Sequence, residues 1–267
     1  MITGFEDALV RAYRESPCAV LPNALWKTLQ ALEAPGVVTS YDLDPGRGAV
    51  NCLLARDDQH LWVCWTRDGQ LPPEIDAATI GQMRLALLHA RYVAQLSTER
   101  SPASERYFRL VHRSAPDRHP LPAGFAFREV DPLREAGTVA ALISRCYPDL
   151  ELSPATVAAW TRHPVYAADL WVWIVEGATG TRVALGIAEL DEDVPEASLE
   201  WIQVLPAYHR RGIGTALVGE LLARIEGRVA FTSVSGRVDS ATNPEALYRR
   251  CGFTGDDIWW VLRRPAD

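Results

Sequence analysis

The stretch Tyr208–Leu217, "YHRRGIGTAL", places two arginines and two glycines immediately before a run of helix-forming residues. The first N–H groups of a helix have no intrahelical partner, and the helix dipole adds about half a positive charge at that end. Glycine also lets a ligand approach the backbone closely. The stretch therefore predicts a site for a phosphate group at the start of a helix.

Two common phosphate-binding loops do not fit this stretch. A Walker A loop requires G-x-x-x-x-G-K-[ST], which the sequence lacks, and a dinucleotide-binding fingerprint requires a third glycine where Leu217 stands. At this point a plain arginine-rich helix start, whose glycines serve only the turn, is still an alternative.

The sequence on both sides of the loop supplies further signals. The preceding segment Leu199–Pro206, "LEWIQVLP", has the pattern of a buried strand, and a second motif, Asn243–Phe253 "NPEALYRRCGF", follows the helix. In this order, the three features resemble the GCN5-related N-acetyltransferase (GNAT) superfamily, whose loop has the pattern Q/R-x-x-G-x-G/A. His209 departs from the Gln or Arg of that pattern. Because such a loop binds phosphate mostly through backbone N–H groups, we expect histidine at position 209 to change the affinity for the cofactor without abolishing binding.

The resemblance implies acetyl-CoA as co-substrate, no metal, and a strand that splays from its neighbour at a bulge so that the pantetheine arm lies in the gap. It also implies that the backbone N–H of Val204 stabilises the oxyanion. By their positions in the motifs, the expected cofactor-binding residues are Ile202, Gln203, Val204, His209, Arg210, Arg211, Gly212, Ile213, Gly214, Thr215, Asn243 and Tyr248.

Catalytic roles follow from the same resemblance, which implies acyl transfer from a thioester to an amine. Tyr248 would protonate the departing thiolate, since a phenol with an ordinary pKa near 10 stays protonated at neutral pH. Glu200 is the leading candidate for the base and shares a strand face with Ile202 if no bulge intervenes. Glu189 and Asp191 are the reserve candidates. The structural alternatives are a core tyrosine at position 248 and a solvent-facing strand residue at position 200.

Composition limits the class of protein. The apolar fraction of 48% and the charged fraction of 23% are those of an ordinary globular protein, and the net charge of −7 disfavours a nucleic-acid binder. The acidic excess lies mostly in residues 119–267, which suits a cationic substrate beside a local anion site. Five scattered cysteines without a C-x-x-C pair indicate reduced thiols, and with no apolar run long enough to span a bilayer we expect a cytoplasmic protein without a membrane partner.

The expected fold class is α/β (α+β), a GNAT fold with a mixed, centrally splayed sheet flanked by helices. The proline-rich segment 98–124 predicts a boundary between an N-terminal α/β domain, 1–118, and a catalytic GNAT domain, 119–267. The N-terminal part reads as two helices, three strands, a long amphipathic helix over 76–96 and a strand, without a glycine loop. It is either a degenerate GNAT-like half that shapes a substrate cleft or an unrelated α+β domain used for homodimer formation.

Three functions are open at this point. The first is an N-acetyltransferase that moves an acetyl group from acetyl-CoA directly to a primary amine of a small molecule or peptide. The second is a non-catalytic acyl-CoA-binding regulatory module, and the third is transfer of a different acyl group. The intact loop and Tyr248 favour the first. The sequence does not name the acceptor amine, because the segments that set specificity carry little shared pattern.

Overall fold

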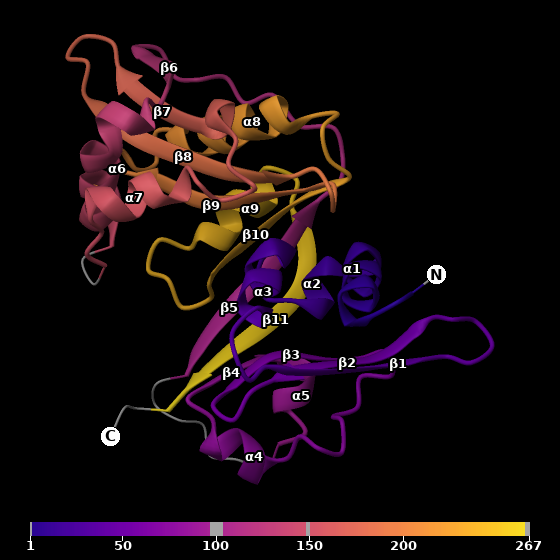
Figure 1. Ribbon diagram of the computed structural model, residues 1–267. Helices are drawn as coiled ribbons and strands as arrows, with labels where there is room; N and C mark the ends of the chain where they lie inside the picture. The colour runs from indigo at the N-terminus through magenta and orange to yellow at the C-terminus, as the bar shows by residue number, and fades with distance from the viewer. Residues whose placement is uncertain (1, 97–103, 148–149, 265–267) are drawn as a thin grey trace. The chain divides into compact units, whose positions relative to one another are not determined.

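The computed structural model describes residues 2–96, 104–147 and 150–264, so part of the predicted linker, 98–103, lies outside the described residues (Figure 1). It divides into two compact units. Unit 1 comprises Met1–Val111, Ser235–Pro244 and Gly255–Asp267, and unit 2 comprises His112–Val234 and Glu245–Thr254. The sequence predicted one boundary near residue 118, whereas these units divide near residue 111 and two later stretches belong to unit 1.

Unit 1 combines helices with a mixed sheet. Its helices are α1 (Phe5–Glu15), α2 (Pro17–Val20), α3 (Leu25–Leu32), α4 (Ala77–Gln82) and α5 (Ala90–Val93). Its strands are β1 (Val38–Leu43), β2 (Val50–Arg56), β3 (His60–Thr66), β4 (Leu85–His89), β5 (Glu105–His112) and β11 (Thr254–Arg263). Strands β1, β2 and β3 pair antiparallel, β3 and β4 parallel, and β4 and β11 antiparallel. Helices α1–α3 lie on one face of β1–β3, and α4 and α5 on the other (Figure 1).

The predicted long helix over 76–96 is wrong. Asp76 caps α4 by accepting the Thr79 N–H at 2.7 Å, but the helix ends at Gln82 and strand β4 follows. In β4, Ala86 and Leu88 are buried and alternate with half-buried neighbours. The apolar pattern of Leu85–His89 is compatible with a helix or a strand. The segment forms a strand because it pairs with β3 and β11.

Unit 2 is the larger part of the predicted catalytic domain. Its helices are α6 (Pro132–Cys146), α7 (Pro154–Trp160), α8 (Ile213–Ile225) and α9 (Pro244–Arg250), with 3-10 turns η1 (Ala168–Leu170) and η2 (Pro206–Tyr208). Its strands are β6 (Phe125–Glu129), β7 (Trp171–Glu176), β8 (Arg182–Asp191), β9 (Glu196–Val204) and β10 (Phe231–Arg237), of which β10 ends in unit 1. Strands β6 to β9 pair antiparallel and β9 pairs parallel with β10, so the predicted mixed sheet is confirmed.

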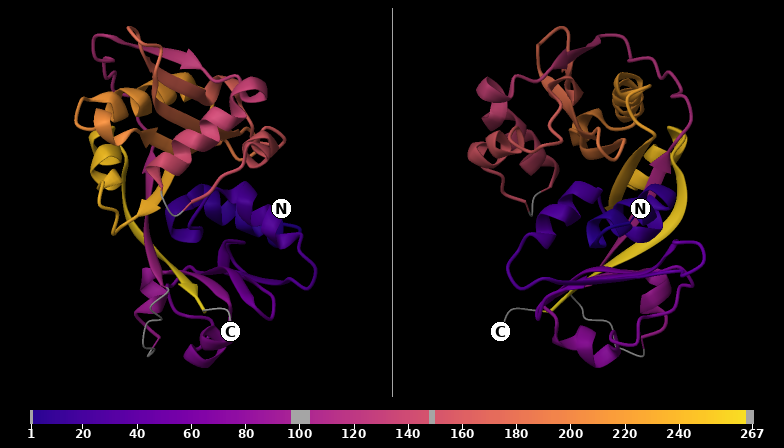
Figure 2. Two further views of the ribbon diagram at one scale, coloured as in Figure 1. Left: turned by 90° about the vertical axis from the view of Figure 1, so that its left-hand side faces the viewer. Right: turned by 45° about the vertical axis from the view of Figure 1, so that its right-hand side comes forward.

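Helices cover both faces of the unit 2 sheet, with α6 and α7 on one side of β7–β9 and α8 on the other (Figure 2). Under α6 and α7, the indoles of Trp171 and Trp173 are almost fully buried. On the other face, a Cβ at Gly186 would lie 2.9 Å from a methyl carbon of Leu217. The absence of a side chain at Gly186 thus lets α8 pack directly on β8.

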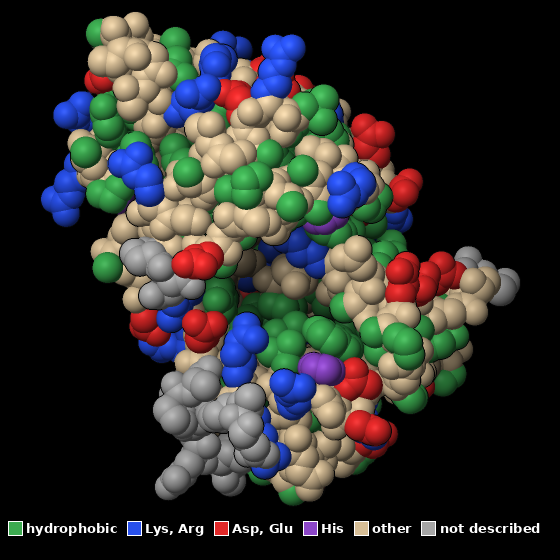
Figure 3. Space-filling model, turned by 60° about the vertical axis from the view of Figure 1, so that its left-hand side comes forward, with side chains coloured by type: hydrophobic (Ala, Val, Ile, Leu, Met, Phe, Trp, Pro, Cys, Tyr) green, Lys and Arg blue, Asp and Glu red, His purple; other side chains and the backbone are tan. Residues whose placement is uncertain are grey.

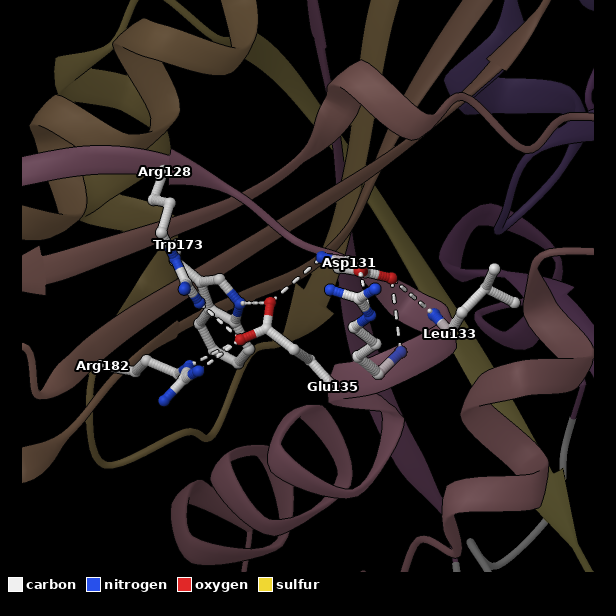
Figure 4. Close-up of polar contacts among 7 residues, drawn as sticks. Arg128, Asp131, Leu133, Glu135, Trp173 and Arg182 are labelled. Carbon is white, nitrogen blue, oxygen red and sulfur yellow. Dashed lines mark hydrogen bonds and ion pairs between the residues drawn. The ribbon is translucent and has the colours of Figure 1, made fainter.

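A buried carboxylate fastens the start of α6 to three strands. Glu135 is 7% exposed and accepts hydrogen bonds from the Arg128 and Arg182 guanidinium groups, from Trp173 Nε1 at 3.1 Å and from the Asp131 N–H at 3.0 Å (Figure 4). Although burial opposes the charged form, these bonds lower the pKa of Glu135 from 4.5 to about 2. The carboxylate therefore joins α6 to β6, β7 and β8.

The surface has mixed character. On the face shown in Figure 3, basic and acidic side chains are interspersed with hydrophobic ones. No helix in the described ranges has the length and apolar character needed to cross a membrane.

Candidate functional site

The register between β8 and β9 shifts by one residue at Glu200. Against β8, Ile187 faces Trp201 but Ala188 faces Leu199, so Glu200 is an extra residue in a β-bulge. On the other side, the parallel pairing with β10 covers only Glu196–Leu199. Beyond the bulge, β9 and β10 separate, and we call Trp201–Val204 the open edge of β9. The predicted splay is therefore present, and the bulge marks where it begins.

The open edge presents backbone polar groups away from β8. The Leu205 N–H donates to the Val183 carbonyl at 2.9 Å, so Leu205 points its backbone groups toward β8. Because these groups alternate along a strand, those of Ile202 and Val204 point to the opposite side. Among the described residues they have no strand partner there, since the β10 register has already ended. Such an edge can pair with the amide groups of an extended ligand.

The bulge places Glu200 on the α7 side of the sheet. The Ser198 hydroxyl donates to Glu200 Oε1 at 2.6 Å, and residues two apart on a strand share a face. Trp201, next in the chain, stacks on Trp160 of α7 with ring centroids 5.4 Å apart. Two consecutive side chains thus turn toward the same side of the sheet.

Ile202 and Val204 face the other side. A Cβ at Gly214, in the first turn of α8, would lie 3.7 Å from Val204 Cγ2. In a regular strand, Glu200 and Ile202 would share a face. The bulge intervenes between them, so their side chains lie on opposite faces of the sheet. Gln203 is buried opposite Leu185, and by the same alternation its backbone groups point toward β8, so neither its side chain nor its backbone faces the open edge.

The glycine loop forms the predicted helix start. After η2, Arg210 and Gly212 adopt left-handed backbone conformations with φ of 60° and 80°, and α8 begins at Ile213. No side chain caps this helix, so its first N–H groups remain available to an anion. Glycine at position 212 satisfies a conformation that other residues rarely adopt.

The side chains around the loop differ in their roles. His209 Nε2 lies 2.8 Å from the Val204 carbonyl oxygen, so the imidazole N–H closes the turn between β9 and α8. Arg210 and Arg211 are exposed, and the Arg211 guanidinium lies over the Tyr208 ring at 5.0 Å. Ile213 is buried in the core and Thr215 is half-buried. The position that departs from the family pattern therefore holds the end of the open edge in place.

Tyr248 projects from α9 into a buried environment. It is 7% exposed, and its ring meets the Phe253 ring edge-on at 5.7 Å. Burial raises the pKa of Tyr248 well above its usual range, and the nearby Tyr147, Cys251 and Glu200 raise it further. This phenol is thus protonated and uncharged at neutral pH.

The remaining predicted residues have separate surroundings. Asn243 belongs to unit 1 and has a left-handed backbone, φ 46°, immediately before α9. Asp191 accepts the N–H groups of Asp193 and Val194 at 3.0 and 3.1 Å and so holds the turn between β8 and β9. Glu189 Oε1 lies 3.8 Å from His163 Nδ1. Glu200 is thus among the groups whose charge raises the pKa of Tyr248, and Asp191 has a structural task.

An aromatic cluster beside Glu200 was not predicted. Tyr147, at the end of α6, meets Trp201 edge-on at 6.3 Å, and Trp160 of α7 completes the cluster. These three residues lie far apart in the sequence and show no local pattern. The one local signal for this cluster in the sequence was Trp201, which directly follows Glu200, the expected base.

Comparisons with known proteins identify a family for part of this chain. Residues 168–255 match the model of the family described as "Acetyltransferase (GNAT) domain". Residues 168–255 therefore form a GNAT domain, and proteins of this family typically use acetyl-CoA. No curated protein matches the chain.

Solved structures resemble the whole chain. A GCN5-related N-acetyltransferase from Sphaerobacter thermophilus superimposes with a TM-score of 0.68 at 14% identity, covering 97% of this chain and 91% of that one. A tandem GNAT protein from the clavulanic acid biosynthesis pathway gives 0.55 at 14% identity, covering 98% and 94%. A GNAT-family acetyltransferase from Colwellia psychrerythraea gives 0.60 at 11% identity, covering 99% and 98%. The GNAT-like fold thus extends across the whole chain, as in tandem GNAT structures.

Proposed function

We propose that this protein transfers an acetyl group from acetyl-CoA directly to a primary amine. The observation that carries the proposal is the open edge of β9, which begins at a bulge and leads directly into an uncapped helix start. A long ligand that has amide groups in its middle and phosphates at one end matches this arrangement.

The residues present fit acetyl-CoA. The backbone groups of Ile202 would pair with the pantetheine amides, and the first N–H groups of α8 would bind the pyrophosphate. The Val204 carbonyl is held by His209, which leaves the Val204 N–H for the thioester end of the ligand. Arg210 and Arg211 are exposed beside that helix start and would add charge-assisted hydrogen bonds to phosphate. When bound, acetyl-CoA supplies the thioester.

The chain's own groups would complete the reaction. Glu200 takes a proton from the ammonium of the acceptor, so that the neutral nitrogen can form a bond to the acetyl carbon. The Val204 N–H donates to the acetyl oxygen as negative charge develops there. Tyr248 gives its proton to the sulfur as the carbon–sulfur bond breaks and regains one from the newly bonded nitrogen, so the net reaction releases only the proton that Glu200 took up. The products are the amide and free CoA.

The first test is release of free CoA over a panel of primary amines, together with calorimetric titration of CoA. We expect CoA binding and amine-dependent CoA release, with the acetylated amine identified by mass spectrometry. Tight CoA binding without turnover of any amine would instead support a non-catalytic binding module.

Replacement of Glu200 by glutamine tests the base. We expect kcat at pH 7 to fall by about 100-fold, because general base catalysis contributes roughly 10²–10⁴-fold. The loss should shrink as the pH approaches about 10, the range where a free alkyl amine loses its proton unaided. The measurement is kcat against pH for both proteins.

Glu189→Gln is the matched control for this substitution. Its carboxylate lies 3.8 Å from His163 Nδ1 and takes no part in the proposed reaction, so we expect kcat to stay within about twofold of wild type. A large loss in Glu189→Gln with none in Glu200→Gln would transfer the role of base to Glu189.

Replacement of His209 tests the turn between β9 and α8. We expect His209→Ala to weaken CoA binding by about fivefold, because a typical hydrogen bond contributes about 1 kcal/mol. His209→Gln should bind CoA within about twofold of wild type, since a glutamine amide can still donate to the Val204 carbonyl. Calorimetric titration of CoA measures both, and equal losses in the two variants would contradict this role.

A further inference from the structure

An exposed aromatic ring lies next to the proposed reaction centre. Tyr147 is 45% exposed, although it stands at the end of a well-packed helix, and its ring meets Trp201 edge-on. Trp201 in turn stacks on the half-buried Trp160 with an interplanar angle of 15°. The two indoles thus fix the surface on which the Tyr147 ring stands.

This ring is close to both residues that the proposed reaction uses. Trp201 directly follows Glu200 at the bulge, and both side chains turn to the α7 side. Tyr147 is also one of the groups whose charge raises the pKa of Tyr248. The exposed ring, the carboxylate and the buried phenol therefore meet in one region of unit 2.

The chemistry of this region suits one class of acceptor. A carboxylate beside aromatic rings favours an ammonium group, through charge and through the electron-rich ring faces. An acceptor with its own negative charge would be repelled by Glu200. The exposed Tyr147 ring extends apolar surface beyond the carboxylate, and an aromatic group gains from packing on such a ring in an offset or edge-on geometry.

We infer that the acceptor is a primary amine joined to an aromatic ring by a short flexible chain. Its ring packs against Tyr147 and Trp201, and its ammonium points to Glu200. This assignment rests on the proposed function, because it names the substrate class of that same site. Tyr147 is then a specificity-determining residue.

The experiment compares 2-phenylethylamine with propylamine, two primary amines that differ in the ring. In wild type we expect kcat/KM to be about tenfold higher for 2-phenylethylamine, because an aromatic pair contributes about 0.5–1.5 kcal/mol beyond apolar burial. Tyr147→Ala should remove most of this preference and leave propylamine within about twofold, whereas Tyr147→Phe should keep it. The Kd for CoA should stay unchanged in both variants.

Tyr41→Ala is the matched control, since Tyr41 is a 39% exposed tyrosine on β1 of unit 1 and should not affect the preference. Equal use of the two amines by wild type, or equal losses for both amines in Tyr147→Ala, would overturn the inference. If no amine is acetylated, the proposed function fails, and calorimetric titration of 2-phenylethylamine with CoA present still tests the site. Binding lost in Tyr147→Ala would support it, and no binding to wild type would overturn it.

Discussion

Replacing Tyr248 with phenylalanine is expected to lower kcat by about 100-fold or more, because a positioned general acid contributes roughly 10²–10⁴-fold. The Kd for CoA should change by less than about threefold, since the substitution removes one hydroxyl and keeps the ring. The ring packs edge-on against Phe253, so α9 should keep its place. Steady-state kinetics and calorimetric titration of CoA measure the two quantities separately.

Tyr166→Phe provides the control for loss of a phenolic hydroxyl in unit 2. Tyr166 packs edge-on against Trp171 at 5.6 Å and takes no part in the proposed reaction. We expect its kcat to equal that of wild type. A Tyr248→Phe variant with wild-type kcat would remove Tyr248 from the mechanism and leave it as a core tyrosine.

The protonation state of Tyr248 leads to a matching expectation for pH. Burial raises the pKa of this phenol above its usual value near 10, so its proton is present throughout the neutral and mildly alkaline range. The rate in wild type should therefore not fall between about pH 7 and 9 through loss of this proton. A fall in that range that disappears in Tyr248→Phe would contradict the shifted pKa.

Local signals in the sequence were sufficient to place the helix that follows the glycine loop and the helix of the second motif. The sequence predicted a helix start within Tyr208–Leu217, and α8 spans Ile213–Ile225, because glycine at the left-handed position 212 fixes where it begins. The second motif, Asn243–Phe253, likewise contains α9, which begins at Pro244 directly after Asn243. Such signals involve neighbours in the chain, so they can be read without knowledge of the packing.

Features that depend on distant partners could not be read in this way. Segment 76–96 contains strand β4 because β3 and β11 pair with it, and one of these partners lies at the far end of the chain. The bulge at Glu200 is defined by the register against β8, and it reverses the face on which the carboxylate lies. The aromatic cluster at Tyr147 joins three elements in the same manner.

The Glu135 carboxylate also joins distant elements, and its removal is expected to have the largest effect on stability. Glu135→Ala should lower the free energy of unfolding by about 3–5 kcal/mol, as for other buried ion pairs that lose one partner. The substitution leaves the Trp173 indole N–H and two guanidinium groups without their shared acceptor (Figure 4). Denaturant unfolding followed by tryptophan fluorescence measures the loss.

Glu129→Ala is the matched control, since the Glu129 side chain is 71% exposed and its ion pair with Arg224 spans 3.6 Å. We expect it to change the free energy of unfolding by less than about 1 kcal/mol. If Glu129→Ala and Glu135→Ala lower the free energy of unfolding equally, the buried network at the start of α6 stabilises the fold no more than an exposed ion pair does.

The pH dependence of this loss has a definite sign. The pKa of Glu135 is about 2 in the folded protein against 4.5 for the free side chain, so its contribution is complete above about pH 4.5. As the pH falls from 4.5 to 2, Glu135 is protonated first in the unfolded chain and then in the folded chain. Its contribution to the free energy of unfolding, on the order of 3 kcal/mol, is lost over this range. The difference in stability between wild type and Glu135→Gln should therefore shrink over this range. A difference that stays constant down to pH 2 would mean that packing, and not the charge of Glu135, ties α6 to the strands.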